Sequence, residues 1–291
     1  MRVMLFCYGN GKKRTRVGMT TSFSVVGSPI EHSLSPVLHT AAYKHLGLDF
    51  AYGKNAVPAG GLRDFLSSSD LSGVSVTMPL KNEAFDLAAS HDDDSLTTGV
   101  ANTLVNSSSG WRAFNTDVYG ICQAISNVSE PKITVVIGSG ATARSAMLAL
   151  AKLFPKTEVQ LVSRNQTAED ELKVFGQKLG LSVSTKPATA QTLMRADLVM
   201  SLVPAGSYVE LWEEIRHSGN SNSGTLFDVA YNPWPSMAGL AWIPSTVISG
   251  IEMLVWQAIE QVQVFAAASG SSSGIDRSAL YSVMKAAVSP K

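Results

Sequence analysis

The chain of 291 residues has only two cysteines, Cys7 and Cys122, and its Lys and Arg residues (23) equal its Asp and Glu residues (23) in number. Two cysteines give no disulfide framework, and no Cys/His spacing is typical of a zinc site, so we expect a reducing, cytoplasmic location and no bound metal. Balanced charge offers no field that would attract nucleic acid or an anionic membrane. The sequence also has no apolar run that approaches the length of a membrane span. We therefore expect neither a nucleic-acid partner nor a membrane segment.

Residues 1–18 differ in character from the rest of the chain. Their apolar run is too short for a secretory signal, and Lys12, Lys13 and Arg14 follow it where a small-residue cleavage site would stand. A clear strand pattern, residues 23–27, begins just after Met19. We expect that translation starts at Met19 or that residues 1–18 form a loose arm.

Short apolar strands alternate with helical patterns almost throughout, which indicates an α/β protein with mainly parallel sheets. The expected strands are 23–27, 50–56, 73–77, 101–105, 133–137, 158–163, 197–202 and 225–229. The expected helices are 36–47, 59–68, 80–89, 117–128, 141–154, 167–179, 207–217, 250–268 and 276–288.

Breaks in this pattern suggest two domains. The segment 133–249 contains enough strands and helices for a nucleotide-binding domain of the Rossmann type. We expect that domain to span 118–250, and a substrate domain to combine 19–117 with 251–291. The two C-terminal helices should pack back on the first domain, because a helix pair alone could not bury its apolar faces.

The most informative segment, 133–144, reads ITVVIGSGATAR, an apolar strand that runs into glycines and then a helix. Gly138 allows a tight turn, and Gly140 lets the backbone approach phosphate oxygens without an intervening Cβ. Ala143 stands at the third position of the GxGxxG pattern, where Gly or Ala is accepted. The start of the helix offers unpaired N–H groups and the positive end of its dipole. The pattern predicts a dinucleotide site, with a plain strand-to-helix turn as the alternative.

The end of the next expected strand bears on which dinucleotide is bound. About 20 residues after the glycine turn, an NAD site usually has Asp or Glu for the ribose 2′-OH, but this chain reads Ser163-Arg164-Asn165. A carboxylate would repel a 2′-phosphate, whereas a guanidinium can bind one bidentately. We therefore predict NADP(H), with an exposed loop arginine as the alternative.

Polar residues at other strand ends are candidates for substrate binding. Ser35 precedes Pro36 and could simply cap a helix, or its hydroxyl and that of Ser33 could both donate to a carboxylate. Lys81 stands at an expected helix start, where the helix dipole disfavours a cation, which favours a functional reason for it. Asp117 either caps the next helix or pairs with Lys81.

Seven motifs occur together in this order: HSLSP (32–36), GVSVTMPLK (73–81), GVANTLV (99–105), FNTDVYG (114–120), VIGSGATARSA (136–146), DVAYNP (228–233) and GIEMLVWQ (250–257). In order and spacing, from about residue 23 to 288, the set closely resembles the shikimate dehydrogenase family. The resemblance implies an oxidoreductase that reversibly reduces 3-dehydroshikimate to shikimate with NADPH, in aromatic amino-acid biosynthesis.

The resemblance also implies residue roles. The substrate carboxylate would be held by Ser33 and Ser35. The ring hydroxyls would be bound by Thr77, Asn102, Asp117 and Gln257, with Tyr231 near the same pocket. The cofactor would be bound at its pyrophosphate by Gly138, Ser139, Gly140, Ala141 and Thr142, at its 2′-phosphate by Ser163 and Arg164, and at its nicotinamide by Val229, Gly250 and Met253.

The sequence departs from the family pattern at three places. Ser75 stands where many members have Asn, so we expect local hydrogen bonding to change without loss of activity. Thr40 follows His39 where many members again have Asn, and we expect a structural adjustment there. The loop that starts at Ser163 lacks the second basic residue that usually follows Arg164, which weakens the NADP prediction more than the family assignment.

The residues suggest a mechanism. Lys81 would stabilise the negative charge that grows on the ketone oxygen and supply its proton, and Asp117 would orient that amine. We expect the cleft to close around hinges near residues 117–120 and 247–250. A quinate/shikimate dehydrogenase that uses NAD and a catalytically silent dinucleotide-sensing relative stay open as alternatives. The protein is expected to be a monomer or a homodimer.

Overall fold

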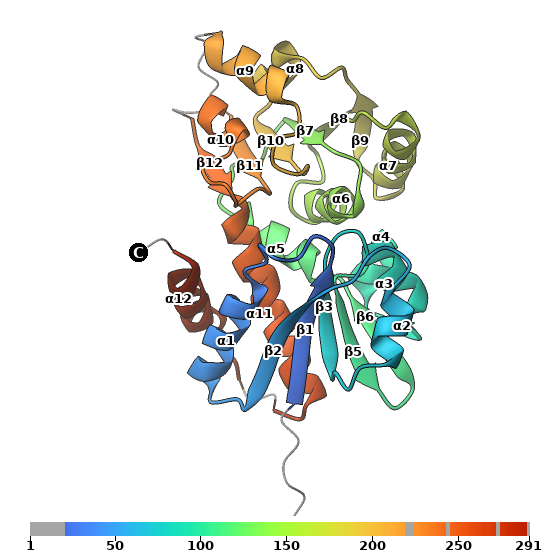
Figure 1. Cartoon of the computed structure of the whole chain (residues 1–291). Helices are drawn as coiled ribbons and strands as arrows, with labels where there is room; N and C mark the ends of the chain where they lie inside the picture. The colour runs from blue at the N-terminus through green and yellow to red at the C-terminus, as the bar shows by residue number, and fades with distance from the viewer. Residues whose placement is uncertain (1–20, 219–223, 243–244, 272–273, 290–291) are drawn as a thin grey trace, which may run out of the picture.

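The computed structural model describes residues 21–218, 224–242, 245–271 and 274–289. The expected N-terminal arm 1–18, the candidate start at Met19, and Cys7 lie outside these residues. The chain forms two lobes, each built on a six-stranded sheet (Figure 1). The first sheet uses strands from residues 21–114 and the second uses strands from residues 133–249. The α/β class and the two-lobed arrangement agree with the sequence, while the exact domain limits at 118 and 250 stay a prediction.

The first sheet has the strand order β2-β1-β3-β5-β6-β4. Its strands are β1 (Thr21–Gly27), β2 (Phe50–Ala56), β3 (Gly73–Val76), β4 (Ser90–His91), β5 (Thr103–Ser107) and β6 (Gly110–Phe114). β1 is parallel to β2 and β3, whereas β5 is antiparallel to both of its neighbours. Only a tight turn joins β5 to β6, and a connection this short produces an antiparallel pair. The first sheet is therefore less uniformly parallel than the alternating pattern suggested.

Helices cover both faces of the first sheet. One face carries α1 (Ser35–Leu46), α11 (Gly250–Ala268) and α12 (Arg277–Val288), and the other carries α2 (Leu62–Ser67) and α3 (Lys81–Leu87) (Figure 1). Leu280 and Met284 of α12 are fully buried in one cluster with Phe23 of β1 and Leu38 of α1. The C-terminal helices thus return to the first lobe, as the sequence predicts.

The second sheet is parallel throughout, in the order β12-β11-β10-β7-β8-β9. Its strands are β7 (Ile133–Ile137), β8 (Glu158–Val162), β9 (Ser182–Thr185), β10 (Leu198–Ser201), β11 (Thr225–Asp228) and β12 (Val247–Ser249). The helices α6 (Ala141–Leu153) and α7 (Gln166–Lys178) pack on one face, and α8 (Ala190–Met194), α9 (Val209–His217) and α10 (Met237–Trp242) pack on the other. This is the doubly wound arrangement of nucleotide-binding folds.

Two helices join the lobes. α5 (Thr116–Ala124) leaves the first sheet toward the second, and α11 leads back from β12. They pack closely at Gly120, where a Cβ would lie 2.8 Å from Cβ of Gln257. The helix α4 (Asp93–Thr98) adds a further bridge, because Arg144 Nε of α6 donates to the Thr98 carbonyl over 2.5 Å. These contacts hold the glycine turn of the second lobe opposite the strand ends of the first.

Candidate active site

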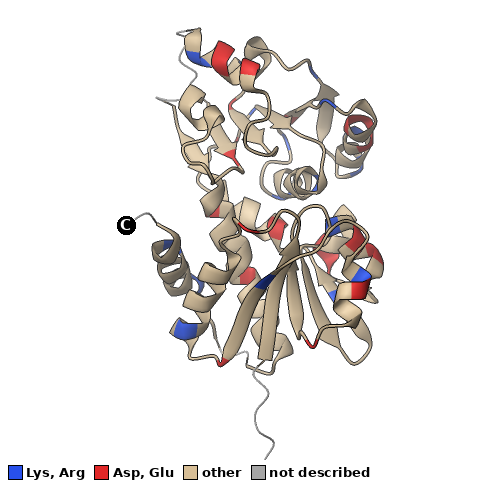
Figure 2. Ribbon diagram, viewed as in Figure 1, with Lys and Arg blue, Asp and Glu red and all other residues tan. Residues whose placement is uncertain are grey.

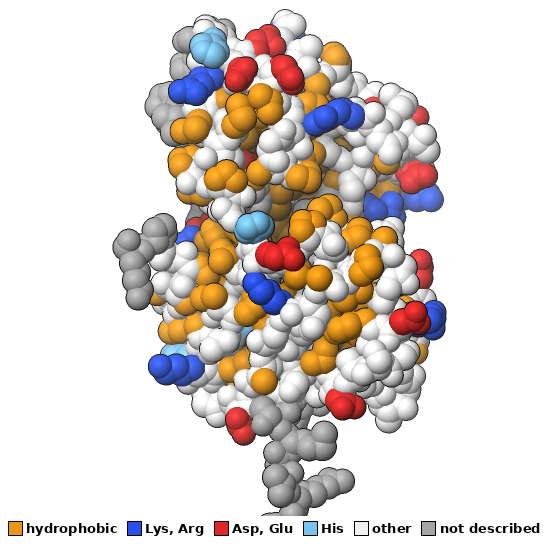
Figure 3. Space-filling view, in the orientation of Figure 1, with side chains coloured by type: hydrophobic (Ala, Val, Ile, Leu, Met, Phe, Trp, Pro, Cys, Tyr) orange, Lys and Arg blue, Asp and Glu red, His pale blue; other side chains and the backbone are white. Residues whose placement is uncertain are grey.

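A cavity of about 280 Å³ lies between the lobes, and the molecular surface is hollowed there (Figure 3). The first lobe contributes Ser33, Ser35, Thr77, Lys81, Asn102 and Asp117 to its wall. Gln257 reaches it from α11. The second lobe contributes Thr142, Val229 and Tyr231, and Gly250 and Met253 follow at the start of α11. Charged residues of both signs are spread over both lobes (Figure 2).

Lys81 and Asp117 form the charged centre of the cavity. Lys81 is the first residue of α3, and its Nζ donates to Asp117 Oδ2 over 2.5 Å. The side chains of this pair are 13% and 5% exposed. The other carboxylate oxygen, Oδ1, accepts from Asn102 Nδ2 over 2.8 Å. Asp117 lies in the first turn of α5, but the N-cap residue of that helix is Asn115. Of the two roles considered for Asp117, capping the helix and pairing with Lys81, the structure therefore shows the pairing.

Asn102 is held rigidly beneath this ion pair. Its Oδ1 accepts from the backbone N–H of Thr116 over 2.9 Å and from Thr103 Oγ1 over 2.9 Å. Its Nδ2 lies 3.3 Å from Gln257 Oε1, and Gln257 Nε2 donates to the Leu254 carbonyl over 2.8 Å. Because these amides are fixed by several bonds, they present a defined pattern of donors and acceptors at the cavity wall.

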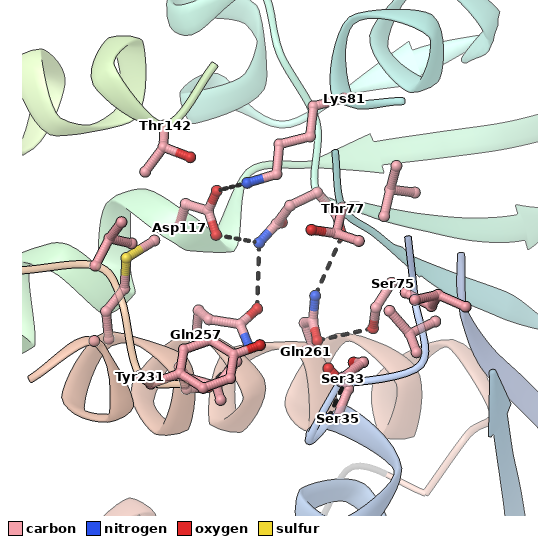
Figure 4. A pocket seen from close by; sticks show the side chains of 18 of the residues that line it. Ser33, Ser35, Ser75, Thr77, Lys81, Asp117, Thr142, Tyr231, Gln257 and Gln261 are labelled. Atoms are coloured by element: carbon pink, nitrogen blue, oxygen red, sulfur yellow. Dashed lines mark hydrogen bonds and ion pairs between the residues drawn. The ribbon is translucent and has the colours of Figure 1, made fainter. Parts of the chain in front are cut away.

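Ser33 and Ser35 lie at the opposite end of the cavity from Lys81 (Figure 4). The simpler alternative, in which Ser35 caps α1, is wrong: Leu34 is the N-cap residue, and it already has helical φ and ψ of −86° and −4°. The chain enters the helix through a turn in which the N–H of Ser33 donates to the Ile30 carbonyl over 3.0 Å. Ser35 is therefore not needed as a cap, and both serines line the cavity.

The sequence reasoning missed Gln261, which lies one turn beyond Gln257 in α11 and lines the same cavity. Its Nε2 donates to the Asn102 carbonyl over 3.2 Å and to Thr103 Oγ1 over 3.0 Å. Its Oε1 accepts from Ser75 Oγ over 2.8 Å. The departure from the family pattern at Ser75 was visible in the sequence, but its partner lies 186 residues away. No motif joined the two residues.

His39 also contacts Gln261, so that both donors and both lone pairs of this amide are used. His39 Nε2 lies 3.2 Å from Gln261 Oε1, and His39 Nδ1 lies 3.1 Å from the Tyr43 hydroxyl. The side chain is fully buried, and burial lowers the pKa of His39 to about 3. A neutral imidazole satisfies both contacts by donating from Nε2 and accepting at Nδ1. The hydroxyl of Tyr52 extends the network by donating to Ser75 Oγ over 2.6 Å.

The glycine turn of the second lobe has the features that a pyrophosphate needs. Gly138 has φ of +112°, which only glycine adopts readily. A Cβ built on Gly140 would meet nothing within 4 Å among the described residues, so the backbone there faces open space. Gly140 is also the N-cap residue of α6, whose start no side chain of the described residues caps. The N–H groups at the start of α6 have no side-chain cap, and the space beside Gly140 is open, so the turn has both the donors and the room for a bound phosphate group.

The end of β8 adjoins this turn. Ser139 and Ser163 share a hydrogen bond of 2.8 Å between their hydroxyls. Arg164 follows on the surface, and Asn165 caps α7 by accepting from the N–H of Ala168 over 3.1 Å. An exposed guanidinium at this strand end fits a 2′-phosphate better than a free ribose hydroxyl.

The nicotinamide side of the site is formed where β11 meets α11. A Cβ on Gly250 would lie 1.9 Å from the Val229 carbonyl oxygen, so only glycine permits this close approach. Met253 follows one turn later on the wall of the cavity. Tyr231 lines the cavity beside them, and burial raises the pKa of its hydroxyl. The approach at Gly250 brings this part of the second lobe against the cavity that holds Lys81.

Three further observations concern metal ligands, membrane-spanning helices and the thiol of Cys122. Among the described residues, no group of three His, Cys, Asp or Glu side chains could hold a metal ion. Within the same residues, no helix is both long and apolar enough to cross a membrane. Cys122 is a free thiol whose pKa is raised by burial to about 11, so it has little thiolate character at neutral pH.

Comparisons with known proteins point to one family. A sequence profile of the shikimate dehydrogenase substrate binding domain matches residues 25–104. A shikimate dehydrogenase (NADP(+)) of Prochlorococcus marinus is 33% identical over 267 residues, which cover 84% of this chain and 92% of that protein. One from Ignicoccus hospitalis is 32% identical, with 85% of this chain and 94% of that protein covered. The crystal structure of Mycobacterium tuberculosis shikimate dehydrogenase superposes with a TM-score of 0.79 at 32% identity, covering 91% of this chain and 99% of that one.

Proposed function

This chain belongs to the shikimate dehydrogenase family, and we propose that it reversibly reduces 3-dehydroshikimate to shikimate with NADPH. The observation that carries the proposal is the 2.5 Å ion pair between Lys81 and Asp117, which lines one cavity with Thr142 of the glycine-turn helix. Such an arrangement lets an amine act on the oxygen of a ketone while a nicotinamide acts on its carbon. Bound NADPH supplies the hydride.

Lys81 acts on the ketone oxygen. As negative charge grows there, the Lys81 ammonium stabilises it and transfers a proton to the oxygen, and in the reverse direction the amine accepts that proton. Asp117 aims the amine and binds a ring hydroxyl of the substrate. Because Asn102 Nδ2 donates to the second oxygen of Asp117 over 2.8 Å, the carboxylate cannot rotate away from Lys81 without losing this bond.

The rest of the cavity orients the ring. Ser33 and Ser35 donate to the substrate carboxylate at the end away from Lys81. The ring hydroxyls are bound by Thr77, Asn102 and Gln257, with Tyr231 beside them. With its carboxylate and its ketone held at opposite ends, the substrate presents one carbon to the hydride donor.

The second lobe holds the cofactor. The turn from Gly138 to Thr142 holds the pyrophosphate, with the N–H groups at the start of α6 as donors. Ser163 and Arg164 bind the 2′-phosphate. Val229, Gly250 and Met253 line the nicotinamide position. Closure about residues 117–120 and 247–250, between a substrate domain (19–117 with 251–291) and a cofactor domain (118–250), would then exclude water from the reacting atoms.

An assay of the purified protein with four substrate and cofactor pairs tests the function. Shikimate or quinate is combined with NADP⁺ or NAD⁺, and the absorbance of the reduced nicotinamide is followed. We expect the highest kcat/KM for shikimate with NADP⁺. Faster turnover of quinate with NAD⁺ would favour the alternative enzyme, and no reduction with any pair would favour a silent dinucleotide-sensing relative.

We place the enzyme in the cytoplasm as a monomer or a homodimer. A reducing compartment suits Cys122, which is a free thiol, and it suits a reaction that consumes NADPH. Fractionation of cells that express the protein, together with light scattering of the purified protein, tests both statements.

A further inference from the structure

Arg164, the candidate ligand of the 2′-phosphate, stacks on an aromatic ring that no sequence motif indicated. The centre of its guanidinium lies 4.4 Å from the ring centroid of Tyr208. Tyr208 is the N-cap residue of α9 and is partly exposed, while Arg164 is exposed. A guanidinium at this distance over an aromatic face is attracted by the negative charge of the ring face.

The backbone at Tyr208 is unusual. Its φ and ψ are 57° and 38°, and among the described residues it is the only residue other than glycine with positive φ. A bulky side chain in this left-handed region is disfavoured, so the surrounding structure must impose it. Trp212 Nε1 donates to the Ser207 carbonyl over 3.2 Å, and the Trp212 N–H donates to the Tyr208 carbonyl over 3.1 Å. These bonds hold the turn that sets the direction of the Tyr208 ring.

This ring lies at the edge of the sheet where the cofactor is proposed to bind. β10, which leads to Tyr208, pairs with β7, and β7 pairs with β8, which leads to Arg164. Because the three strands are parallel, their carboxyl ends meet at one edge, where such sheets bind ligands. The loop after β10 also touches the glycine turn, since a Cβ on Gly138 would lie 3.1 Å from Cγ1 of Val203.

Because Arg164 is a single arginine, its binding of the 2′-phosphate depends on how well its side chain is held in place. The loop from Ser163 to Ala168 contains no cation other than Arg164. An exposed arginine loses side-chain freedom when it binds a phosphate, and a side chain held in place beforehand loses less. The stacked ring leaves the N–H groups at the edge of the guanidinium available for a bidentate phosphate contact.

We propose that Tyr208 is a positioning residue that holds Arg164 for the 2′-phosphate, and so favours the phosphorylated dinucleotide over the unphosphorylated one. The proposal rests on the NADP(H) assignment made above. It assigns no contact between Tyr208 and the substrate, so the chemical step is left to the groups already described.

Calorimetric titration with two probes tests the proposal without turnover. Adenosine 2′,5′-bisphosphate carries the 2′-phosphate, and adenosine 5′-monophosphate lacks it. In Tyr208→Leu, we expect the Kd for the bisphosphate to rise about two- to fivefold, the range for an exposed cation–π contact, while the Kd for the monophosphate stays within twofold. Tyr208→Phe keeps the ring and should bind the bisphosphate nearly as the wild type does.

Further variants separate positioning from a general structural role. Tyr208→Gly suits the positive φ while removing the ring, so it gives a folded test if Tyr208→Leu does not fold, and we expect the same loss for the bisphosphate. In an Arg164→Leu background, Tyr208→Leu should cause no additional loss. Arg112→Leu removes a stacked arginine from the first lobe, where Arg112 lies over Phe114, and should bind both probes as the wild type does.

Each other outcome overturns the proposal in a recognisable way. Equal weakening of both probes in the Tyr208 variants would mean that the ring acts on adenosine or on the fold. Unchanged binding of the bisphosphate in a folded variant without the ring would mean that stacking does not position Arg164. If the wild type itself binds both probes equally, the NADP(H) assignment is wrong, and the proposal falls with it.

Discussion

The two sides of the cleft are built in different ways. On the side of the first sheet, polar side chains from distant segments are buried and bonded to one another, and the whole residues Asn102, Asp117 and Gln261 are 2%, 3% and 2% exposed. On the side of the second sheet, the candidate ligand-binding groups are the backbone around Gly140 and the exposed side chain of Arg164.

The difference reflects what each side has to recognise. A small polyhydroxylated ring is distinguished by the directions of its hydroxyls, which requires donors and acceptors that are fixed before it binds. A pyrophosphate is recognised by its charge, which N–H groups at a helix start can meet without any side chain. Substitutions on the first side should therefore alter turnover or stability, and substitutions on the second side should alter cofactor affinity alone.

The largest effect is expected from Lys81→Ala, which removes the amine proposed to accept the proton in shikimate oxidation and to donate it in the reverse reaction. General acid–base catalysis is worth roughly 10²- to 10⁴-fold, so kcat for shikimate oxidation should fall by that factor, with a smaller change in KM. Steady-state kinetics at saturating NADP⁺ measures it. Lys44→Ala, at an exposed position of α1, is the matched control and should leave kcat unchanged. A kcat near that of the wild type in Lys81→Ala would show that another group moves the proton.

Gln261→Leu should break the network beneath the cavity. The variant keeps much of the side-chain volume but leaves Ser75, Thr103 and the Asn102 carbonyl without this partner. A buried polar group without a partner costs roughly 1–3 kcal/mol, so we expect the free energy of unfolding to fall by about 3 kcal/mol. Urea denaturation followed by fluorescence measures it, with Gln177→Leu at an exposed site of α7 as the control. Equal stability of the two variants would contradict this role of the network.

His39 should make the stability of the protein depend on pH. Burial lowers the pKa of His39 from 6.5, the ordinary value for a histidine in an unfolded chain, to about 3 in the folded protein. Between these values the unfolded state binds the proton and the folded state does not, so this contribution to stability is complete above pH 6.5 and is lost as the pH falls toward 3.

The loss between pH 7 and pH 5 should amount to about 2 kcal/mol for this one group. Urea denaturation at the two pH values measures it as the difference between the wild type and His39→Gln, which cannot titrate at this position. His45→Gln, at an exposed position near the end of α1, should keep the wild-type dependence. If the free energy of unfolding depended on pH in the same way in the wild type and in His39→Gln, His39 would bind its proton as readily in the folded protein as in the unfolded chain.

The contrast between the two sides also explains what the sequence could predict. The glycine turn is one continuous segment, so the strand before it, Gly138, Gly140 and the helix after it are readable from spacing alone. Most long strands and helices are recognisable for the same reason. The short strands β4, β9 and β12, of two to four residues, have too few positions to show a period. The strand β6 and the helices α4, α8 and α10 were missed too, and none of them exceeds six residues.

The substrate side depends on contacts between segments that only folding brings together. Lys81 and Asp117 could be paired in advance because each belongs to a motif and their charges are opposite. The role of Gln261 could not be predicted in this way, because it depends on contacts with Ser75 and His39, which belong to separate elements of the first lobe. A glutamine in an apolar helix has no distinguishing pattern until the strands beneath it are placed.

Of the substitutions at Lys81, Gln261, His39 and Gly140, the smallest effect is expected on the cofactor side, from Gly140→Ala. The added Cβ would meet no described atom within 4 Å, so the free energy of unfolding should stay within about 0.5 kcal/mol of the wild-type value. The methyl group would occupy the space through which the backbone approaches the pyrophosphate, and we expect the Kd for NADP⁺ to rise about tenfold. Gly53→Ala in β2, where the Cβ would lie 3.7 Å from Ser24 Oγ, is the control for adding a methyl group away from the cleft. Unchanged NADP⁺ binding in Gly140→Ala would place the pyrophosphate elsewhere, while a loss of stability would show that this turn is packed against the protein and does not face a ligand.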